Sequence, residues 1–329
     1  MKKKLFALVM AMIMILSLAA CGGKDEGKGA AAVDTNTVAV GAVVIARDDV
    51  PEDDIYAFVS AIFENTAAIS EQHDKGKELD LDFAASVTSV PYHPGAAKYF
   101  AEKGKNVAVK DGAGTGESKA LTFGTGSESG TYYAFGGVLS SYVSNNTSVS
   151  VTTVTSGGSK ANIEDLAAGN VQLAFVQSDV MSYGYNGERL FDSAVTGFST
   201  VAALYMEQVQ IVTTNPDIKS VADLAGKSVS IGDRGSGVWF NAVDVLGAYG
   251  IDPDSGISPV FQGFSDSAES LKDGKIDAAF VVAGAPTTAI VDLATSKPVY
   301  LVGLDEEHTN DLLAASPYYS AYTIPAGTY

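Results

Sequence analysis

The sequence is poor in the residues that most often carry metal, redox or phosphate chemistry. It contains one cysteine, three arginines and three histidines among 329 residues. A single thiol cannot form an intramolecular disulfide or a cysteine-based metal site. Asp and Glu outnumber Lys and Arg by 39 to 21, a formal net charge of −18. Such a chain repels nucleic-acid phosphates, so we expect no nucleic-acid partner.

Common catalytic motifs are also missing. None of His73, His93 and His308 has metal-ligand spacing, and no Gly-x-Ser-x-Gly elbow accompanies them. The turn at 124–130 reads Gly-x-Gly-x-x-x-Gly, one residue longer than the dinucleotide-binding pattern, and no phosphate-binding Lys-Ser/Thr follows it. The sequence therefore predicts a protein that is not an enzyme and that carries no cofactor or metal.

The N-terminus has the pattern of an export signal. Lys2–Lys4 precede an uncharged apolar run, Leu5–Ala20, which is short for a bilayer span of about 20 residues. The sequence Leu-Ala-Ala-Cys ending at Cys21 resembles a bacterial lipobox, which implies that Cys21 is acylated and anchors the protein to the lipid bilayer. The alternative is an ordinary signal peptide with an incidental cysteine.

The rest of the chain predicts a globular α/β protein. Apolar residues make up 46% of the sequence and mean hydropathy is +0.14, and roughly 100–200 residues per domain suggests two domains. Residues 37–46 read as a buried strand, Pro51 opens a helix, and a second helix is expected at about 95–103. The Gly-rich stretch 105–118 reads as a linker.

An internal repeat covers the last 210 residues. The stretch 121–132 and the stretch 229–239 each read as a strand, a Gly/Ser turn and a helix start. Downstream of each, 166–176 and 271–281 share a helix end, a capping glycine and a buried strand. Two repeats with these signals in the same order predict two α/β lobes.

The two turns are the candidate ligand site. A helix N-terminus presents free N–H groups and partial positive charge, which favour an anion, and Arg234 in the second turn could pair with a carboxylate. Tyrosines after the turns and Gln177 at a strand end could complete the site. The alternative is two tight turns with Arg234 solvated. The predicted ligand-binding residues are Thr125, Gly126, Ser129, Thr131, Tyr132, Gln177, Tyr183, Arg234, Ser236 and Gly237.

Five further motifs are Phe-Gly-Thr-Gly-Ser-Glu-Ser-Gly-Thr-Tyr-Tyr at 123–133, Val-Gln-Ser-Asp-Val at 176–180, Glu-Gln-Val-Gln-Ile-Val at 207–212, Asp-Leu-Ala-Gly-Lys-Ser-Val-Ser-Ile-Gly at 223–232 and Ile-Pro-Ala-Gly-Thr-Tyr at 324–329. Together these motifs resemble the TAXI-type solute-binding proteins of TRAP transporters. The resemblance implies a two-lobed type II periplasmic-binding-protein fold with a hinge. It also implies delivery of a small carboxylate, glutamate among the candidates, to TRAP transporter membrane subunits.

The order of segments departs from that family. The segment resembling 35–104 follows the Ile-Pro-Ala-Gly-Thr-Tyr motif in the family, but here it comes first, which indicates a circular permutation, natural or engineered. Tyr329 and Asn36 are then expected within roughly 15 Å of each other. The expected divisions are a signal peptide at 1–20, a lipidated cysteine and tether at 21–34, lobe I at 35–104 and 119–207, a linker at 105–118, lobe II at 208–322 and a hinge return at 323–329.

The predicted function is capture of a small carboxylate, either a glutamate-like amino acid or a dicarboxylate, by hinge closure. The protein is expected to be a monomer on the outer face of the cytoplasmic membrane. The alternatives are an exported α/β enzyme and a ligand-sensing receptor domain on the same scaffold, including an engineered permuted sensor.

Overall fold

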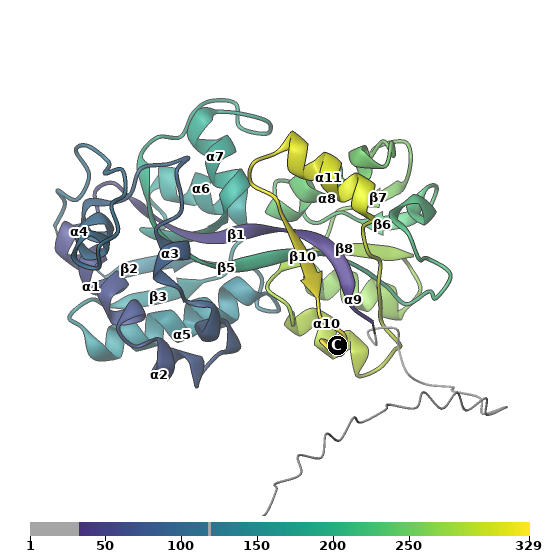
Figure 1. Ribbon diagram of the computed structural model, residues 1–329, viewed down its shortest axis with the longest axis horizontal. Helices are drawn as coiled ribbons and strands as arrows, with labels where there is room; N and C mark the ends of the chain where they lie inside the picture. Colours follow the sequence, from purple (N-terminus) through teal and green to yellow (C-terminus); the bar gives the residue numbers. More distant parts are fainter. Residues whose placement is uncertain (1–32, 118–119) are drawn as a thin grey trace, which may run out of the picture.

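The computed structural model describes residues 33–117 and 120–329. The predicted signal peptide and Cys21 lie outside the described residues. Figure 1 shows two α/β lobes side by side, joined by long strands that run through both. The strands form one continuous sheet in the order β3-β2-β4-β1-β5-β8-β6-β7, with β10 beside β1 and β9 beside β5. The predicted two-lobed α/β architecture is therefore confirmed.

Both lobes repeat the same arrangement, as the internal repeat predicts. In lobe I, β2 lies between β3 and β4, and all three are parallel; in lobe II, β6 lies between β7 and β8 in the same way. The first lobe contains β2 (Leu121–Gly124), α5 (Thr131–Asn146), β3 (Val151–Val154), α6 (Ser159–Ala168), β4 (Leu173–Gln177) and α7 (Ser178–Asn186). The second contains η2 (Val221–Leu224), β6 (Ser228–Ser230), α8 (Gly237–Ala248), β7 (Ser258–Val260), α9 (Phe264–Lys272), β8 (Ala278–Ala283), α10 (Thr288–Ala294), β9 (Tyr300–Leu301) and α11 (Glu306–Ala315).

Two antiparallel strands cross between the lobes. They are β1 (Thr35–Arg47) and β5 (Phe198–Thr213), which pair over most of their length. Val38 and Val40 pack in the core of lobe II, whereas Ala42 and Val44 pack in the cores of lobe I. The crossing in β1 therefore lies near Gly41, opposite Met206 of β5.

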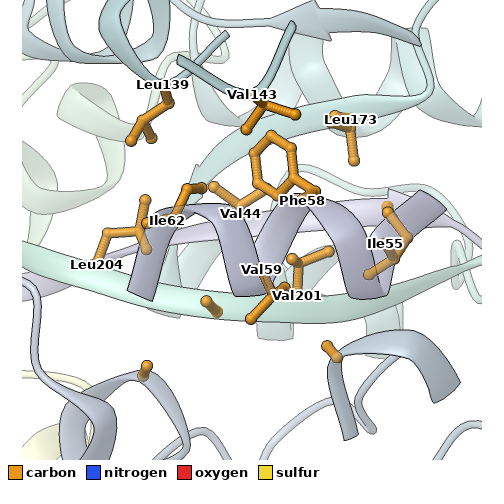
Figure 2. Close-up of a cluster of buried hydrophobic side chains, with 14 of the residues drawn as sticks. Val44, Ile55, Phe58, Val59, Ile62, Leu139, Val143, Leu173, Val201 and Leu204 are labelled. Atoms are coloured by element: carbon orange, nitrogen blue, oxygen red, sulfur yellow. The ribbon is translucent and has the colours of Figure 1, made fainter. Parts of the chain in front are cut away.

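The segment before the repeat completes lobe I. Its helices are α1 (Glu52–Phe63), α2 (Thr66–Ser70), η1 (Asp74–Glu78), α3 (Leu81–Ala84) and α4 (Pro94–Glu102). Pro51 directly precedes α1, where its fixed φ suits a helix start, and three acids occupy the first turn at the positive end of the dipole. Figure 2 shows the apolar face of α1 packed between α5 and β5, with Phe58 and Ile62 fully buried. Each such side chain contributes about 1.5–3 kcal/mol of burial free energy.

The predicted linker is held against lobe I. Tyr92 exchanges backbone hydrogen bonds with Ala108 and Lys110, and Gly114 bonds to Asp48 and Glu52. The Gly-rich composition of this stretch permits the turns it makes, because Gly112 and Gly114 both have positive φ. Residues 105–117 thus follow the surface of lobe I.

The chain end lies beside the start of the fold. Strand β10 (Ser320–Ile324) is antiparallel to β1, with Ile324 opposite Thr35 and Thr323 opposite Asn36. Beyond the strand, the Ala326 N–H donates to Asp34 Oδ1 at 2.9 Å. The Tyr329 hydroxyl is buried against Gln210 and Thr287. This is the geometry that a permuted chain requires, and the permutation itself stays a prediction.

Candidate functional site

A cavity of about 70 Å³ lies between the two lobes. Its walls come from the turns that follow β2, β3, β6 and β7, from the last residues of β4 and β8, and from Glu207 of β5, so the carboxyl ends of strands from both lobes face a common space. The residues that line it include Gly126, Ser127, Gly130, Thr131, Tyr132, Ser156, Gly157, Gly158, Ser159, Gln177, Glu207, Gly232, Asp233, Ser236, Gly237, Val238, Gln262, Gly263, Phe264, Val282 and Ala283.

Five helices begin at the wall of this cavity. Their N-cap residues are Gly130 for α5, Gly158 for α6, Gln177 for α7, Ser236 for α8 and Gly263 for α9. Only Ser236 caps its helix with a side chain, by accepting from the Trp239 N–H at 3.4 Å. Glycine caps leave first-turn N–H groups free, so several amides and five positive dipole ends converge on one cavity.

The cavity wall also holds polar side-chain atoms without a partner. Gln177 is 2% exposed, and its Oε1 accepts no hydrogen bond within the described residues; Gln262 Nε2 is equally unpaired. Unpaired buried polar atoms cost about 1–3 kcal/mol each unless a ligand or water satisfies them. One acceptor on lobe I and one donor on lobe II therefore favour a ligand that contacts both lobes.

Glu207 is the more deeply buried of the two acidic residues in the cavity wall. It is 2% exposed on β5, and its Oε2 accepts a 2.6 Å hydrogen bond from the Tyr132 hydroxyl. The Tyr132 ring stacks on Phe175 at 4.7 Å between centroids, which holds the hydroxyl in place. Burial raises the pKa of Glu207 to about 8, although the hydrogen bond from Tyr132 opposes the shift. Glu207 is therefore mostly protonated and neutral at pH 7.

No lysine or arginine lines the cavity among the described residues; its acidic lining residues are Glu207, which is mostly neutral at pH 7, and Asp233. Lys75 is the cation that acts on Glu207, but its Nζ pairs with Glu78 Oε1 at 2.5 Å. Positive potential in the cavity thus comes from backbone dipoles and not from a side chain.

Six of the predicted residues are brought together in this cavity. They are Gly126, Thr131, Tyr132, Gln177, Ser236 and Gly237. The hydroxyls of two of them are already engaged: Thr131 Oγ1 donates to the Gly284 carbonyl across the lobe boundary at 2.9 Å, and Ser236 caps its own helix. The Tyr132 hydroxyl is engaged as well, because it donates to Glu207 Oε2.

The other four lie elsewhere. Thr125 is fully buried and donates to the Val154 carbonyl, while Ser129 accepts from Ser265 outside the cavity lining. Tyr183 packs against Phe240. Arg234 is exposed, and its guanidinium carbon lies 3.7 Å from the ring centroid of Phe261, so the expected carboxylate partner is not favoured by this geometry.

Several lining residues were not predicted. The turn at 156–159 and the turn at 262–264 are the second βα turn of each lobe, and the repeat could have indicated both because they occupy equivalent places. Glu207 gave no such signal. Its burial depends on Tyr132 and Tyr205, and Tyr132 is 75 residues away in sequence.

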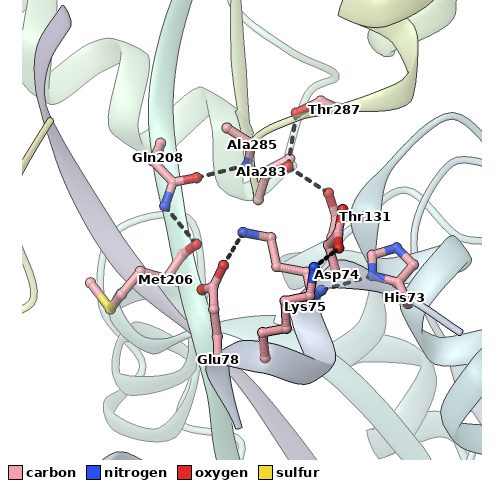
Figure 3. A network of polar contacts seen from close by, with 12 residues as sticks. His73, Asp74, Lys75, Glu78, Thr131, Met206, Gln208, Ala283, Ala285 and Thr287 are labelled. Atoms are coloured by element: carbon pink, nitrogen blue, oxygen red, sulfur yellow. Dashed lines mark hydrogen bonds and ion pairs between the residues drawn. The ribbon is translucent and has the colours of Figure 1, made fainter. Parts of the chain in front are cut away.

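On one side of the cavity, the lobes are in contact around Gln208 of β5 and the residues that follow β8. Figure 3 shows these polar contacts. Gln208 accepts a 2.7 Å hydrogen bond from the Ala285 N–H, and Thr131 bonds to Gly284. Lys75 comes close enough that a Cβ on Gly284 would lie 2.4 Å from its Cε. These contacts hold η1 and α5 of lobe I against the turn after β8.

On the other side, α7 contacts α8. Arg189 donates to both carboxylate oxygens of Asp244, at 3.0 and 2.7 Å. Asn241 donates to Asp179 at 3.0 Å and to the Tyr319 hydroxyl at 2.8 Å. Burial raises the pKa of Asp179 to about 6. This polar cluster joins the lobes along the helices that begin at the cavity.

The described part of the chain also bears on metal binding and membrane crossing. No cluster of three or more His, Cys, Asp or Glu side chains there could hold a metal ion. Within residues 33–117 and 120–329, no helix combines the length and apolarity needed to cross a bilayer.

Comparisons with known proteins give one family match and several partial structural similarities. A model of the NMT1-like family matches residues 25–104 and 123–329. An ancestral arginine-binding protein bound to arginine shows a TM-score of 0.39 at 19% identity, covering 56% of this chain and 78% of that chain. The alkanesulfonate-binding protein SsuA from Xanthomonas axonopodis pv. citri bound to MOPS shows a TM-score of 0.39 at 19% identity, covering 57% of this chain and 61% of that chain. The GluR0 ligand-binding core in complex with L-glutamate shows a TM-score of 0.37 at 14% identity, covering 63% of this chain and 84% of that chain. These similarities are partial.

Proposed function

The chain belongs to the NMT1-like family, and on that premise we propose that it is an extracytoplasmic solute-binding protein that captures a small carboxylate by hinge closure. The convergence of five helix N-termini on one interlobe cavity carries the proposal. Backbone N–H groups and dipole ends bind carboxylates without a cationic side chain. The ligand carboxylate would lie near the turns of Gly130 and Gly237.

Hinge closure is supported by the two crossing strands. Both lobes contribute to the cavity wall, so a ligand that touches both favours the closed arrangement by its differential contacts. The α7–α8 cluster and the Thr131–Gly284 bond would form as the lobes meet. β1 and β5 are continuous through the lobe boundary and can bend there.

The proposed location and partners rest on the N-terminal motif and on the family resemblance. Acylation of Cys21 would hold the protein at the outer face of the cytoplasmic membrane, with residues 22–34 as a tether. Delivery to TRAP-type membrane subunits follows from the TAXI-like motifs at 123–133 and 324–329. The antiparallel pairing of Thr35 with Ile324 supports a permuted chain order.

Ligand screening tests the proposal. Thermal unfolding is measured with small carboxylates, including glutarate, succinate and L-glutamate, and the uncharged diamides of glutarate and succinate are the matched controls. A carboxylate at a hundredfold excess over its Kd should add about 2.7 kcal/mol of stability, whereas its diamide should add little. Amides that stabilise the protein as strongly as the acids would overturn the carboxylate proposal. Recovery of the ligand unchanged after prolonged incubation separates binding from catalysis.

A further inference from the structure

We propose that Glu207 receives a protonated amine of the ligand, so that the site takes carboxylates that also carry an ammonium group, in preference to simple dicarboxylates. This inference rests on the proposed function and deepens it. It is carried by the position of one buried acid in a cavity at which several helices of both lobes begin.

The geometry leaves one oxygen of Glu207 free. Oε2 accepts from the Tyr132 hydroxyl, and among the described residues no hydrogen bond reaches Oε1. Glu207 lines the cavity together with Gln177, so its free oxygen belongs to the surface that a ligand would touch. Phe175 fixes Tyr132 from behind by stacking, which keeps the carboxyl group in one orientation.

The charged and titratable groups around Glu207 leave it without a cation of its own. Tyr132 from α5 and Tyr205 from β5 are neutral, since burial and the nearby acid raise the pKa of both hydroxyls. Lys75 from η1 lowers the pKa of Glu207, but its ammonium group is committed to Glu78. Asp179 from α7 adds a like charge that raises the pKa of Glu207. A ligand ammonium would supply the missing positive charge.

The rest of the cavity complements the other end of such a ligand. The free N–H groups after Gly130 and Gly158 suit a carboxylate, whereas the start of α9 at Gly263 lies beside the Asp233 carboxylate. A second carboxylate placed at Glu207 would meet either a like charge or a neutral acid in a desolvated wall. The charge pattern therefore matches a zwitterion better than a dianion.

A measurable consequence is proton release. Without ligand, Glu207 is protonated below pH 8, and an ammonium beside it favours the ionised form. The proton leaves to buffer on binding, about 0.9 per ligand at pH 7. Because binding releases a proton, affinity should rise about tenfold per pH unit from 6 to 7 and level off above 8.

The test uses matched ligand pairs. Binding of L-glutamate, L-glutamine, L-leucine, L-phenylalanine and L-arginine is compared by calorimetry with binding of the 2-oxo acid of each. Each titration is run in phosphate and in Tris at pH 7, and the difference in heat between the two buffers counts protons released. Wild-type protein is compared with Glu207→Gln, which keeps the shape of the side chain and an acceptor for Tyr132.

We expect at least one amino acid to bind more than tenfold tighter than its 2-oxo acid and to release close to one proton. In Glu207→Gln, both the preference and the proton release should disappear. Equal binding of both members of a pair, or a preference that survives in Glu207→Gln, overturns the ammonium assignment and leaves the carboxylate site standing. Absence of binding by every amino acid, 2-oxo acid and simple carboxylate overturns the proposed function as well.

Discussion

Gln177, at the end of β4 in lobe I, lies directly against Gly237, the first residue of α8 in lobe II. A Cβ on Gly237 would stand 2.0 Å from Gln177 Oε1 and 2.9 Å from Ser159 Oγ. Only a glycine allows the two lobes to approach this closely at the cavity wall. The contact places the unpaired Gln177 oxygen beside the start of a helix, where a ligand bridging the lobes would sit.

Gly237→Ala should therefore weaken ligand binding at least tenfold, because the added methyl group forces Gln177 aside or holds the lobes apart. The measurement is Kd by calorimetry for the ligand found in the screen. Gly247→Ala, on the same helix with no atom within 4 Å of the added Cβ, is the matched control and should retain affinity. Equal affinity in both variants would argue against this contact.

Removing the Arg189–Asp244 pair should loosen the closed arrangement. Both side chains are about three-quarters buried, and the pair is bidentate, so Arg189→Ala is expected to weaken binding about three- to tenfold without touching the cavity. Arg47→Ala removes a similar pair with Asp49 inside lobe I and should leave Kd unchanged. An equal loss in both variants would indicate a general effect of lost charge.

Arg234→Ala should change ligand affinity less than twofold. The guanidinium stacks on Phe261 outside the cavity, so its removal takes away a surface cation–π contact only. Calorimetry on the variant decides between this geometry and the carboxylate pairing expected from the sequence. A loss of binding free energy of about 2 kcal/mol or more would show that Arg234 contacts the ligand.

His93 should make stability depend on pH. Its Nε2 bonds to the Val50 carbonyl at 2.9 Å and its Nδ1 accepts from the Gly95 N–H, so the native ring is neutral. Burial lowers the pKa of His93 to about 4, below its ordinary value of 6.5. The unfolded chain then takes up the proton first, and about 3 kcal/mol of stability is lost as pH falls from 6.5 to 4. Urea denaturation of His93→Gln should show a shallower loss over that window.

Glu207 should make the stability of the ligand-free protein depend on pH in the direction opposite to His93. Burial raises the pKa of its carboxyl group from 4.5 to about 8, so the native state keeps a proton that the unfolded chain releases. The contribution of Glu207 to wild-type stability should fall as pH rises from 5 to 8, by up to about 1.4 kcal/mol per pH unit. Glu207→Gln lacks this dependence, so its stability relative to wild type should grow over the same range. A constant difference would mean that Glu207 is ionised in the native protein.

Much of the fold could be predicted because it is encoded locally. The run of small and β-branched residues at 37–46 marked β1, Pro51 marked the start of α1, and the repeated Gly/Ser turns marked the two lobes. These patterns act over a few residues, where backbone preference and hydrophobic periodicity are sufficient. The turns at Gly126–Thr131 and Ser236–Gly237 were located in the same way.

The composition of the site was decided by tertiary packing. Arg234 and Ser129 lie in the predicted turns, yet their side chains point to Phe261 and Ser265 instead of the cavity. Glu207 reads in the sequence as one acid among 39. It becomes a buried, neutral group only because the fold brings Tyr132 over it and removes water. Local sequence determines where a strand ends and a helix begins, but side-chain direction and desolvation depend on residues far apart in the chain, so only the folded structure sets them.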